Sequence, residues 1–139
     1  MASVLGALTG AAGERQMTRE EMKNRLKVFA VRVIKLVDKL PNTPAGRAIG
    51  SQVVRSGTSP GANYRAACIG KSDKDFLNKL KMVEEELDEI AYWLELIMEL
   101  ELVKPELLQD LHHENKELVS IIVKLSLIHI SEPTRLGMI

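Results

Sequence analysis

Aromatic residues and cysteine are scarce in this chain of 139 residues. Phe, Tyr and Trp make up 4 % of it, and Cys68 is its single cysteine. One cysteine excludes an internal disulfide framework and a CxxC metal site, and it favours a reducing, cytoplasmic setting. No apolar run approaches the roughly 18 residues that a membrane span needs, so we expect no membrane partner. Because 45 % of the residues are apolar, the chain can bury an aliphatic core, and its length suits one domain.

Proline and glycine are few between residues 18 and 125, and no strand pattern or internal repeat is present. Apolar residues recur instead at helical spacing, and cap residues precede each periodic segment. Thr18 and Glu21 form a predicted capping box, and an unbroken stripe from Phe76 to Ile97 is typical of a bundle seam. The predicted helices are about 18–39, 43–69, a third that begins at residue 72 and a fourth that begins at Pro105. The short connections predict an all-α, antiparallel up-down-up-down four-helix bundle over residues 17–124.

The usual chemical sites are missing. A di-iron bundle needs paired Glu-x-x-His motifs, which this chain lacks. His112 and His113 are adjacent on a helix and diverge by about 100°, so a solvated polar face is favoured over a weak metal site with Asp110 and Glu114. Ser56, Ser59 and Cys68 have no nearby histidine that could activate them. We therefore predict no enzyme activity, no cofactor and no metal, and we interpret Asn115 as a polar residue that sets helix register.

The stretch "RSGTSPGANYR", residues 55–65, interrupts the second helical pattern with small residues and a proline. It is no P-loop, because a helix precedes it and no Gly-Lys-Ser/Thr ending follows. Pro60 removes one helical hydrogen bond and should kink the helix, with Thr58 and Ser59 capping the reopened turn. Small side chains on one side would let another helix or a neighbouring subunit approach closely. The predicted helix-contact motif is Gly57, Ser59, Pro60, Gly61, Ala62 and Asn63.

Charge is distributed unevenly. Residues 1–71 hold 12 Lys/Arg and 4 Asp/Glu, a net charge of +8, whereas residues 72–139 hold 7 and 15, a net charge of −8. This pattern indicates either an anionic partner for the basic half or pairing of basic with acidic helices inside one bundle. The candidate nucleic-acid contacts are the basic residues of the first two helices, expected to be exposed: Arg19, Lys23, Arg25, Lys27, Arg32, Lys35, Arg47, Arg55 and Arg65.

Two segments resemble a known family. "QVVRSGTSPGANYRAA", residues 52–67, and "KSDKDFLNKLKMVEEELDEIAYWLELIMELELV", residues 71–103, are similar to the four helix bundle proteins encoded within intervening sequences of bacterial large-subunit ribosomal RNA genes. The accessory variability determinant of diversity-generating retroelements shares that fold. It forms a pentamer and binds a reverse transcriptase and structured template RNA. Many relatives carry a glutamate where this chain has Arg65-Ala66-Ala67, so no acidic group is expected to act there.

The resemblance implies a non-enzymatic, homo-oligomeric accessory protein, with a pentamer as the family-based expectation. Its partners would be structured RNA, a reverse transcriptase, or both. Since aromatic residues for base stacking are nearly absent, RNA binding would depend on phosphates and be weakly sequence-specific. The alternative is a structural interaction module without nucleic-acid binding, in a mobile-element or toxin–antitoxin-like system.

Both ends of the chain differ from the bundle. Residues 1–16 are small and apolar without a basic start, which predicts a flexible leader and no signal peptide. "LSLIHISEPTR", residues 125–135, resembles a translated transposase-type sequencing-library adapter. We therefore interpret residues 125–139 as a read-through tail, with the natural sequence ending near Lys124.

Overall fold

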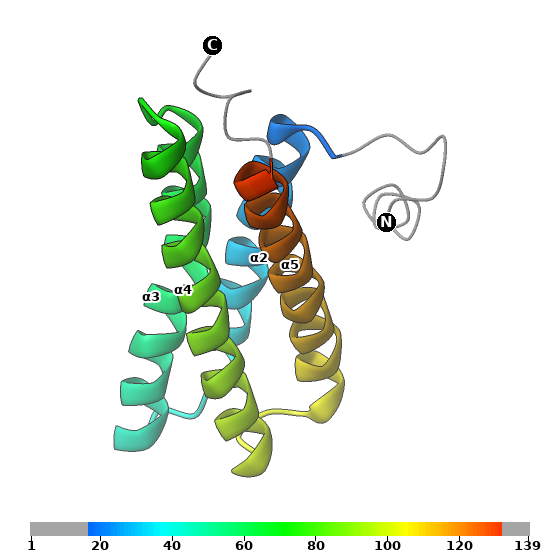
Figure 1. The fold of residues 1–139 in the computed structure, drawn as a ribbon. Helices are drawn as coiled ribbons and strands as arrows, with labels where there is room; N and C mark the ends of the chain where they lie inside the picture. Colours follow the sequence, from blue (N-terminus) through cyan, green and yellow to red (C-terminus); the bar gives the residue numbers. More distant parts are fainter. Residues whose placement is uncertain (1–16, 132–139) are drawn as a thin grey trace.

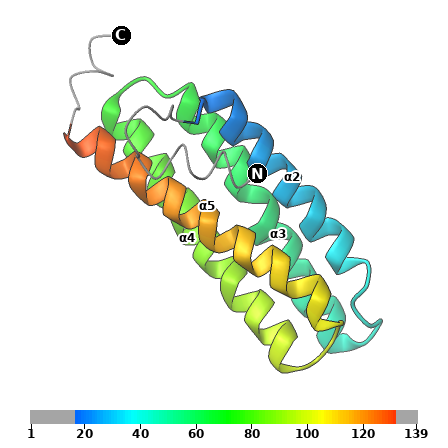
Figure 2. The same ribbon diagram turned by 90° about the vertical axis from the view of Figure 1, so that its right-hand side faces the viewer.

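Four helices account for nearly all of the residues that the computed structural model describes, 17–131. They are α2 (Arg19–Val37), α3 (Pro44–Cys68), α4 (Asp73–Glu99) and α5 (Pro105–Ser131). The predicted leader, 1–16, and residues 132–139 of the predicted tail lie outside the described residues. The helices lie side by side as one bundle (Figures 1 and 2). The prediction of an all-α four-helix bundle is confirmed.

The helices begin where the sequence places their caps. The Thr18 hydroxyl accepts from the Glu21 amide at 3.1 Å, and the Glu21 carboxylate accepts from the Thr18 amide at 2.8 Å, so the capping box forms. Thr43 caps α3 and Ser72 caps α4 in the same way. The connections 38–43, 69–72 and 100–104 are too short to cross the bundle. Consecutive helices are therefore antiparallel neighbours, and α2 packs on α5 to close the arrangement.

The core is aliphatic, as the composition requires. Every residue of the α4 stripe from Phe76 to Ile97 is buried, because its alternating spacing of four and three keeps it on the inner face. Asn115 is buried on the corresponding face of α5, and its side-chain amide donates to the Leu87 carbonyl at 2.9 Å. That bond ties α5 to α4 at one level, which suits the predicted register role.

Helix α3 is continuous through Pro60. The Thr58 hydroxyl donates back to the Val54 carbonyl at 2.7 Å, and the Ser56 hydroxyl donates to the Gln52 carbonyl at 2.8 Å. The Ser59 hydroxyl is buried and has no partner among the described residues. The expected capping of a reopened turn by Thr58 and Ser59 is therefore wrong, since the turn stays helical. The kink near Pro60 stays a prediction.

Helix α5 continues beyond Lys124. Leu125 packs against the core, and the ring of His129 lies 4.2 Å from the ring of Phe76, centre to centre. The segment predicted to be a read-through tail therefore begins inside α5. None of the four helices within residues 17–131 is long and apolar enough to cross a membrane.

Candidate functional site

The small residues of α3 serve two different purposes along the seam with α2. A Cβ added to Gly57 would lie 2.5 Å from Val33 Cγ1, so only glycine lets the two helices approach at this level. A Cβ added to Gly61 would lie 3.6 Å from the nearest atom of Leu26, which is ordinary contact. The close approach predicted for this stretch therefore occurs within one chain, at Gly57. Gly61 borders open space instead.

That open space is a groove between α2 and α3. A cavity of about 270 Å³ is bounded by Leu26, Ala30, Thr58, Gly61 and Ala62, with Lys23, Lys27 and Arg65 on its rim. It continues past Ala66 towards Ile69. We call these three cations and the small residues between them the basic groove. The cations come from two helices and surround a floor in which Leu26, the largest apolar side chain of the lining, is itself buried, so an extended anion can approach the backbone at Gly61 and Ala62.

The cations of the basic groove are largely free of carboxylates. Lys27 and Arg65 are exposed, and within residues 17–131 neither has an acidic partner. Lys23 contacts Glu20 at 3.0 Å in an exposed pair, which is worth about 0–1 kcal/mol and is easily exchanged. Helix α3 contains no Asp or Glu from Pro44 to Cys68. The positive field of the groove is therefore not reduced by α3, whereas Glu20 of α2 lines the part of the groove that continues towards Ile69.

The expectation that Arg25 is exposed is wrong. Its side chain is 5 % exposed and points towards α5, where it donates to Glu114 through two nitrogens at 2.8 Å and to Glu117 at 2.7 Å. Its hydrogen bond with Glu114 raises the pKa of the Arg25 guanidinium, against the opposing effect of burial. Arg25 is thus a structural ion-pair residue that joins α2 to α5, and it cannot contact RNA.

Three other predicted contacts have partners within the chain. Arg55 donates to Glu89 of α4 and, at 2.9 Å, to Gln52. Arg19 donates to the Cys68 carbonyl at 3.3 Å, and its guanidinium lies 5.1 Å from the centre of the Phe76 ring. The third, Arg47, donates to Asn42 at 2.9 Å. All three side chains remain exposed. At Arg55, however, the basic helix α3 pairs with the acidic helix α4, as the second interpretation of the charge pattern expects.

A second basic cluster lies on the other side of α2. Arg32, Lys35 and Lys39 line a recess of about 180 Å³ between α2 and α5, together with Leu36 and two leucines of α5. Lys39 was missed by the sequence analysis. Its spacing of four from Lys35 was the available signal, because residues that far apart share a helix face.

Asn63 is held by the seam between α3 and α4. Its side-chain amide donates to both oxygens of Glu86, at 2.9 and 3.1 Å, and the indole of Trp93 donates to Glu89 at 3.0 Å. Asn63 therefore joins α3 to α4, whereas the bond between Trp93 and Glu89 stays within α4. The structural interpretation of Asn63 accounts for its contacts.

The histidines and the cysteine also have structural surroundings. His112 contacts Glu95 at 3.0 Å, and His113 contacts Glu117 at 2.6 Å. No group of three or more His, Cys, Asp or Glu within residues 17–131 could hold a metal ion. Tyr64 is buried beside Cys68, and burial, followed by the influence of Cys68, raises the pKa of its phenol.

Comparisons with known proteins agree with this architecture. A family model described as 23S rRNA-intervening sequence protein matches residues 19–124. A crystal structure of a protein of unknown function from the S23 ribosomal protein family of Bacteroides thetaiotaomicron is 33 % identical, with a TM-score of 0.71. The similarity covers 76 % of this chain and 97 % of that one. No curated protein matches the sequence. The extent of the family match and the shared bundle lead to one conclusion: this chain belongs to the 23S rRNA intervening sequence protein family.

Proposed function

We propose that this protein is a non-enzymatic, cytoplasmic accessory protein that assembles with itself and binds structured RNA through the phosphate backbone. The observation that carries the proposal is the basic groove. Lys23, Lys27 and Arg65 surround a floor of small residues, and Lys27 and Arg65 have no acidic partner within residues 17–131. The family description and the resemblance to the accessory variability determinant support RNA as the anionic partner.

The chemistry of the groove suits phosphates better than bases. Lysine and arginine neutralise phosphate charge and release counterions, which gives affinity without sequence preference. The floor at Gly61 and Ala62 offers no aromatic surface for base stacking. Binding should therefore follow the shape of a folded RNA backbone. A reverse transcriptase that holds such an RNA is the protein partner that the resemblance supports.

The absence of catalysis is part of the proposal. Among the described hydroxyl residues, Ser56 uses its hydroxyl on the Gln52 carbonyl. The histidines contact Glu95, Glu117 and Phe76, and within residues 17–131 no serine or cysteine side chain is hydrogen-bonded to them. A nucleophile without a base is weak, so the structure favours binding over chemistry.

The alternative function, a protein-interaction module without nucleic acid, is favoured by Arg25 and Arg55. Both use their charge on carboxylates of the acidic helices, which reduces the free positive field of α2 and α3. The two functions differ in whether the cations without a carboxylate partner among residues 17–131, Lys27 and Arg65, bind RNA.

The test uses the full chain and a short RNA hairpin. A triple reversal, Lys23→Glu, Lys27→Glu and Arg65→Glu, removes the groove cations. Arg55 is left intact because its reversal would also break the contact with Glu89. The matched control reverses three cations that precede or lie on α5, Lys104→Glu, Lys116→Glu and Lys124→Glu, with the same change in net charge.

Fluorescence anisotropy measures the dissociation constant across a series of salt concentrations. We expect the unmodified protein to bind with a steep salt dependence, the groove variant to lose binding, and the control to keep most of it. Each lost phosphate contact should reduce the logarithmic salt slope by about 0.9 for a duplex. The proposal fails if the unmodified protein binds no structured RNA at low salt, or if both triple variants lose binding equally.

A further inference from the structure

The second basic cluster surrounds an apolar recess. The recess between α2 and α5 measures about 180 Å³. Cavities that bind small molecules are larger, about 300–1,000 Å³, so this one suits a single apolar side chain better than a small-molecule ligand. Of the leucines that line it, Leu36 and Leu111 are buried and Leu107 is 40 % exposed. An apolar side chain from outside the bundle can therefore contact leucine there, between the cations of α2.

Two exposed valines of α2 extend this apolar surface. Val28 is 39 % exposed and lies four residues before Arg32, and Val31 is 46 % exposed and lies four residues before Lys35. Residues four apart share a helix face, so each valine is next to a cation of the cluster. A surface that combines exposed apolar and cationic side chains is covered best by a partner with apolar and acidic ones.

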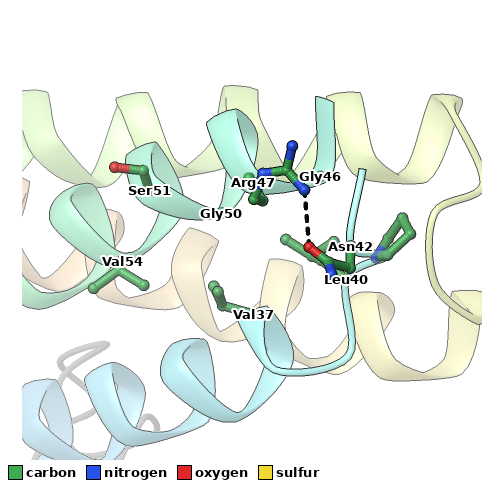
Figure 3. Close-up of a pocket in the computed structure, with 9 residues that line it drawn as sticks. Val37, Leu40, Asn42, Gly46, Arg47, Gly50, Ser51 and Val54 are labelled. Atoms are coloured by element: carbon green, nitrogen blue, oxygen red, sulfur yellow. Dashed lines mark hydrogen bonds between the residues drawn. The ribbon is translucent and has the colours of Figure 1, made fainter. Parts of the chain in front are cut away.

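The charges of the cluster are available to such a partner. Lys35 and Lys39 are exposed, Arg32 is half-buried, and none of the three has an acidic partner within residues 17–131. A recess of about 380 Å³ on the α3 side of α2 is different, because the cation of its lining, Arg47, is held by Asn42 (Figure 3). Of these two recesses in the described structure, the one between α2 and α5 offers unpaired positive charge.

Acidic residues of α5 decide between the classes of anionic partner. Glu106 and Asp110 are exposed and directly precede Leu107 and Leu111, so they adjoin the recess. They would repel a nucleic acid that continued across α5, since its phosphate charge repeats at every nucleotide. The lining of the recess also contains no aromatic ring for base stacking. A short protein segment can instead place its carboxylates on the α2 side alone and an apolar side chain against the leucines.

The spacing of the cations favours a helical segment. Arg32, Lys35 and Lys39 follow one another at intervals of three and four residues, so at 1.5 Å per residue they span about 10.5 Å along α2. Carboxylates at intervals of three and four residues on another helix share one face and repeat at the same heights. Such a helix can lie along the seam between α2 and α5, with an apolar residue of that face in the recess.

We infer that the second basic cluster binds an acidic amphipathic helix of a partner protein. An apolar side chain of that helix fills the recess beside Leu107, and its carboxylates contact the three cations. This goes beyond the proposed function, because it assigns a second surface to a protein partner. Lys23 and Lys27 of the basic groove border the seam with α3 instead, so the two surfaces lie on different sides of α2.

The probe is a fluorescein-labelled, alanine-based helical peptide with glutamates at intervals of three and four residues around one leucine. One control peptide has glutamine in place of each glutamate, and the other has alanine in place of the leucine. Fluorescence anisotropy measures binding to the full chain at low salt, without RNA. The cluster variant is Arg32→Glu, Lys35→Glu and Lys39→Glu. Its matched control is the groove variant described above, which has the same change in net charge.

We expect the unmodified protein and the groove variant to bind the glutamate peptide, and the cluster variant to bind it about tenfold more weakly or less. Both control peptides should bind the unmodified protein about tenfold more weakly or less. A further variant, Leu107→Ser, changes an exposed residue without changing the charge, and it should also weaken binding of the glutamate peptide. Far-UV circular dichroism checks each fold, and if the cluster variant does not fold, Leu107→Ser and the control peptides decide.

No binding of the glutamate peptide, equal binding of the glutamate and glutamine peptides, or equal binding by the cluster and groove variants overturns the inference. So does either of two results that assign the surface to another occupant. An RNA hairpin that binds the groove variant but not the cluster variant would make the cluster an RNA surface. A molar mass that falls in the cluster variant alone, measured by light scattering, would show that another copy of the chain covers it. Because the peptide titration contains no RNA, failure of the proposed RNA binding leaves its result unchanged.

Discussion

Replacing Arg25 with methionine tests whether the buried ion pair holds α2 against α5. Three hydrogen bonds of 2.7 to 2.8 Å join the guanidinium to Glu114 and Glu117, and only one of its nitrogens, Nη1, is buried without a partner in the described structure. Methionine keeps the aliphatic length of the side chain and removes the charge. Two carboxylates would then face each other beside the core without their cation.

The magnitude follows from burial. Removing one partner of a fully buried ion pair costs about 3–5 kcal/mol, whereas exposed pairs contribute about 0–1 kcal/mol. The carboxylates of Glu114 and Glu117 are 16 % and 18 % exposed, so water stabilises them in part after the change. We therefore expect a loss of about 2–3 kcal/mol, which lowers Tm by about 8–12 °C for a bundle of this size.

The assay is thermal and urea unfolding at pH 7, followed by circular dichroism at one fixed protein concentration, since self-assembly couples to stability. The raised pKa of Arg25 makes its contribution to stability fully present below the ordinary pKa of an arginine side chain, and lost only as pH rises through the higher pKa of the folded state. The contribution is therefore complete at pH 7. Arg32→Met on the same helix, a half-buried cation without an ion pair among residues 17–131, is the control and should change stability by less than about 0.5 kcal/mol.

A double-mutant cycle with Glu114→Gln separates the pair from other effects. Because the two side chains share two hydrogen bonds, the double variant should be more stable than the sum of the single changes predicts, by about 1 kcal/mol or more. Additive losses, or an Arg25→Met variant that melts within about 2 °C of the unmodified protein, would refute the reasoning.

Three further changes test the packing. Gly57→Ala should destabilise the protein by about 1–3 kcal/mol, because the added Cβ would meet the stiff Val33 side chain. Gly61→Ala should be neutral or stabilise the protein by up to about 1 kcal/mol, because alanine favours the helix and its Cβ makes only ordinary contacts. Equal urea midpoints for the two variants would contradict this difference. Burial raises the pKa of Tyr64, because the charged phenolate would lose its hydration in the folded protein. The neutral phenol therefore leaves stability unaffected below the ordinary pKa of 10.0, and the free energy of unfolding falls as pH rises above that value, by about 1.4 kcal/mol per pH unit. Tyr64→Phe should reduce the loss of unfolding free energy at alkaline pH, measured by urea unfolding. An unchanged dependence of that free energy on pH would argue against this role of Tyr64. Asn115→Leu should raise Tm, because the amide oxygen of Asn115 is buried without a partner in the described residues. The same change should permit shifted helix register, visible as broadened NMR spectra. An unchanged Tm with sharp spectra would count against a register role.

The sequence by itself determined the helices and their inner faces. Capping and periodicity are local properties, so Thr18 with Glu21, Ser72 and the stripe of α4 could be placed without knowing what lies opposite them. Short connections then left few arrangements other than an antiparallel bundle. The family resemblance depended on the same local patterns, which is why its fold prediction is confirmed.

Only the tertiary structure decided the fate of the individual charges and small residues. Arg25 and Lys27 look alike in the sequence, but the first faces Glu114 of α5 and the second borders an open groove. Gly57 meets Val33 while Gly61 meets open space. These differences depend on residues far away in the chain. Successive side chains are rotated by about 100° around the helix, and the height at which neighbouring helices meet decides which residue each of them faces. The composition supplies the positive charge, and the packing of α2 against α3 and α5 decides which part of it remains available for a partner.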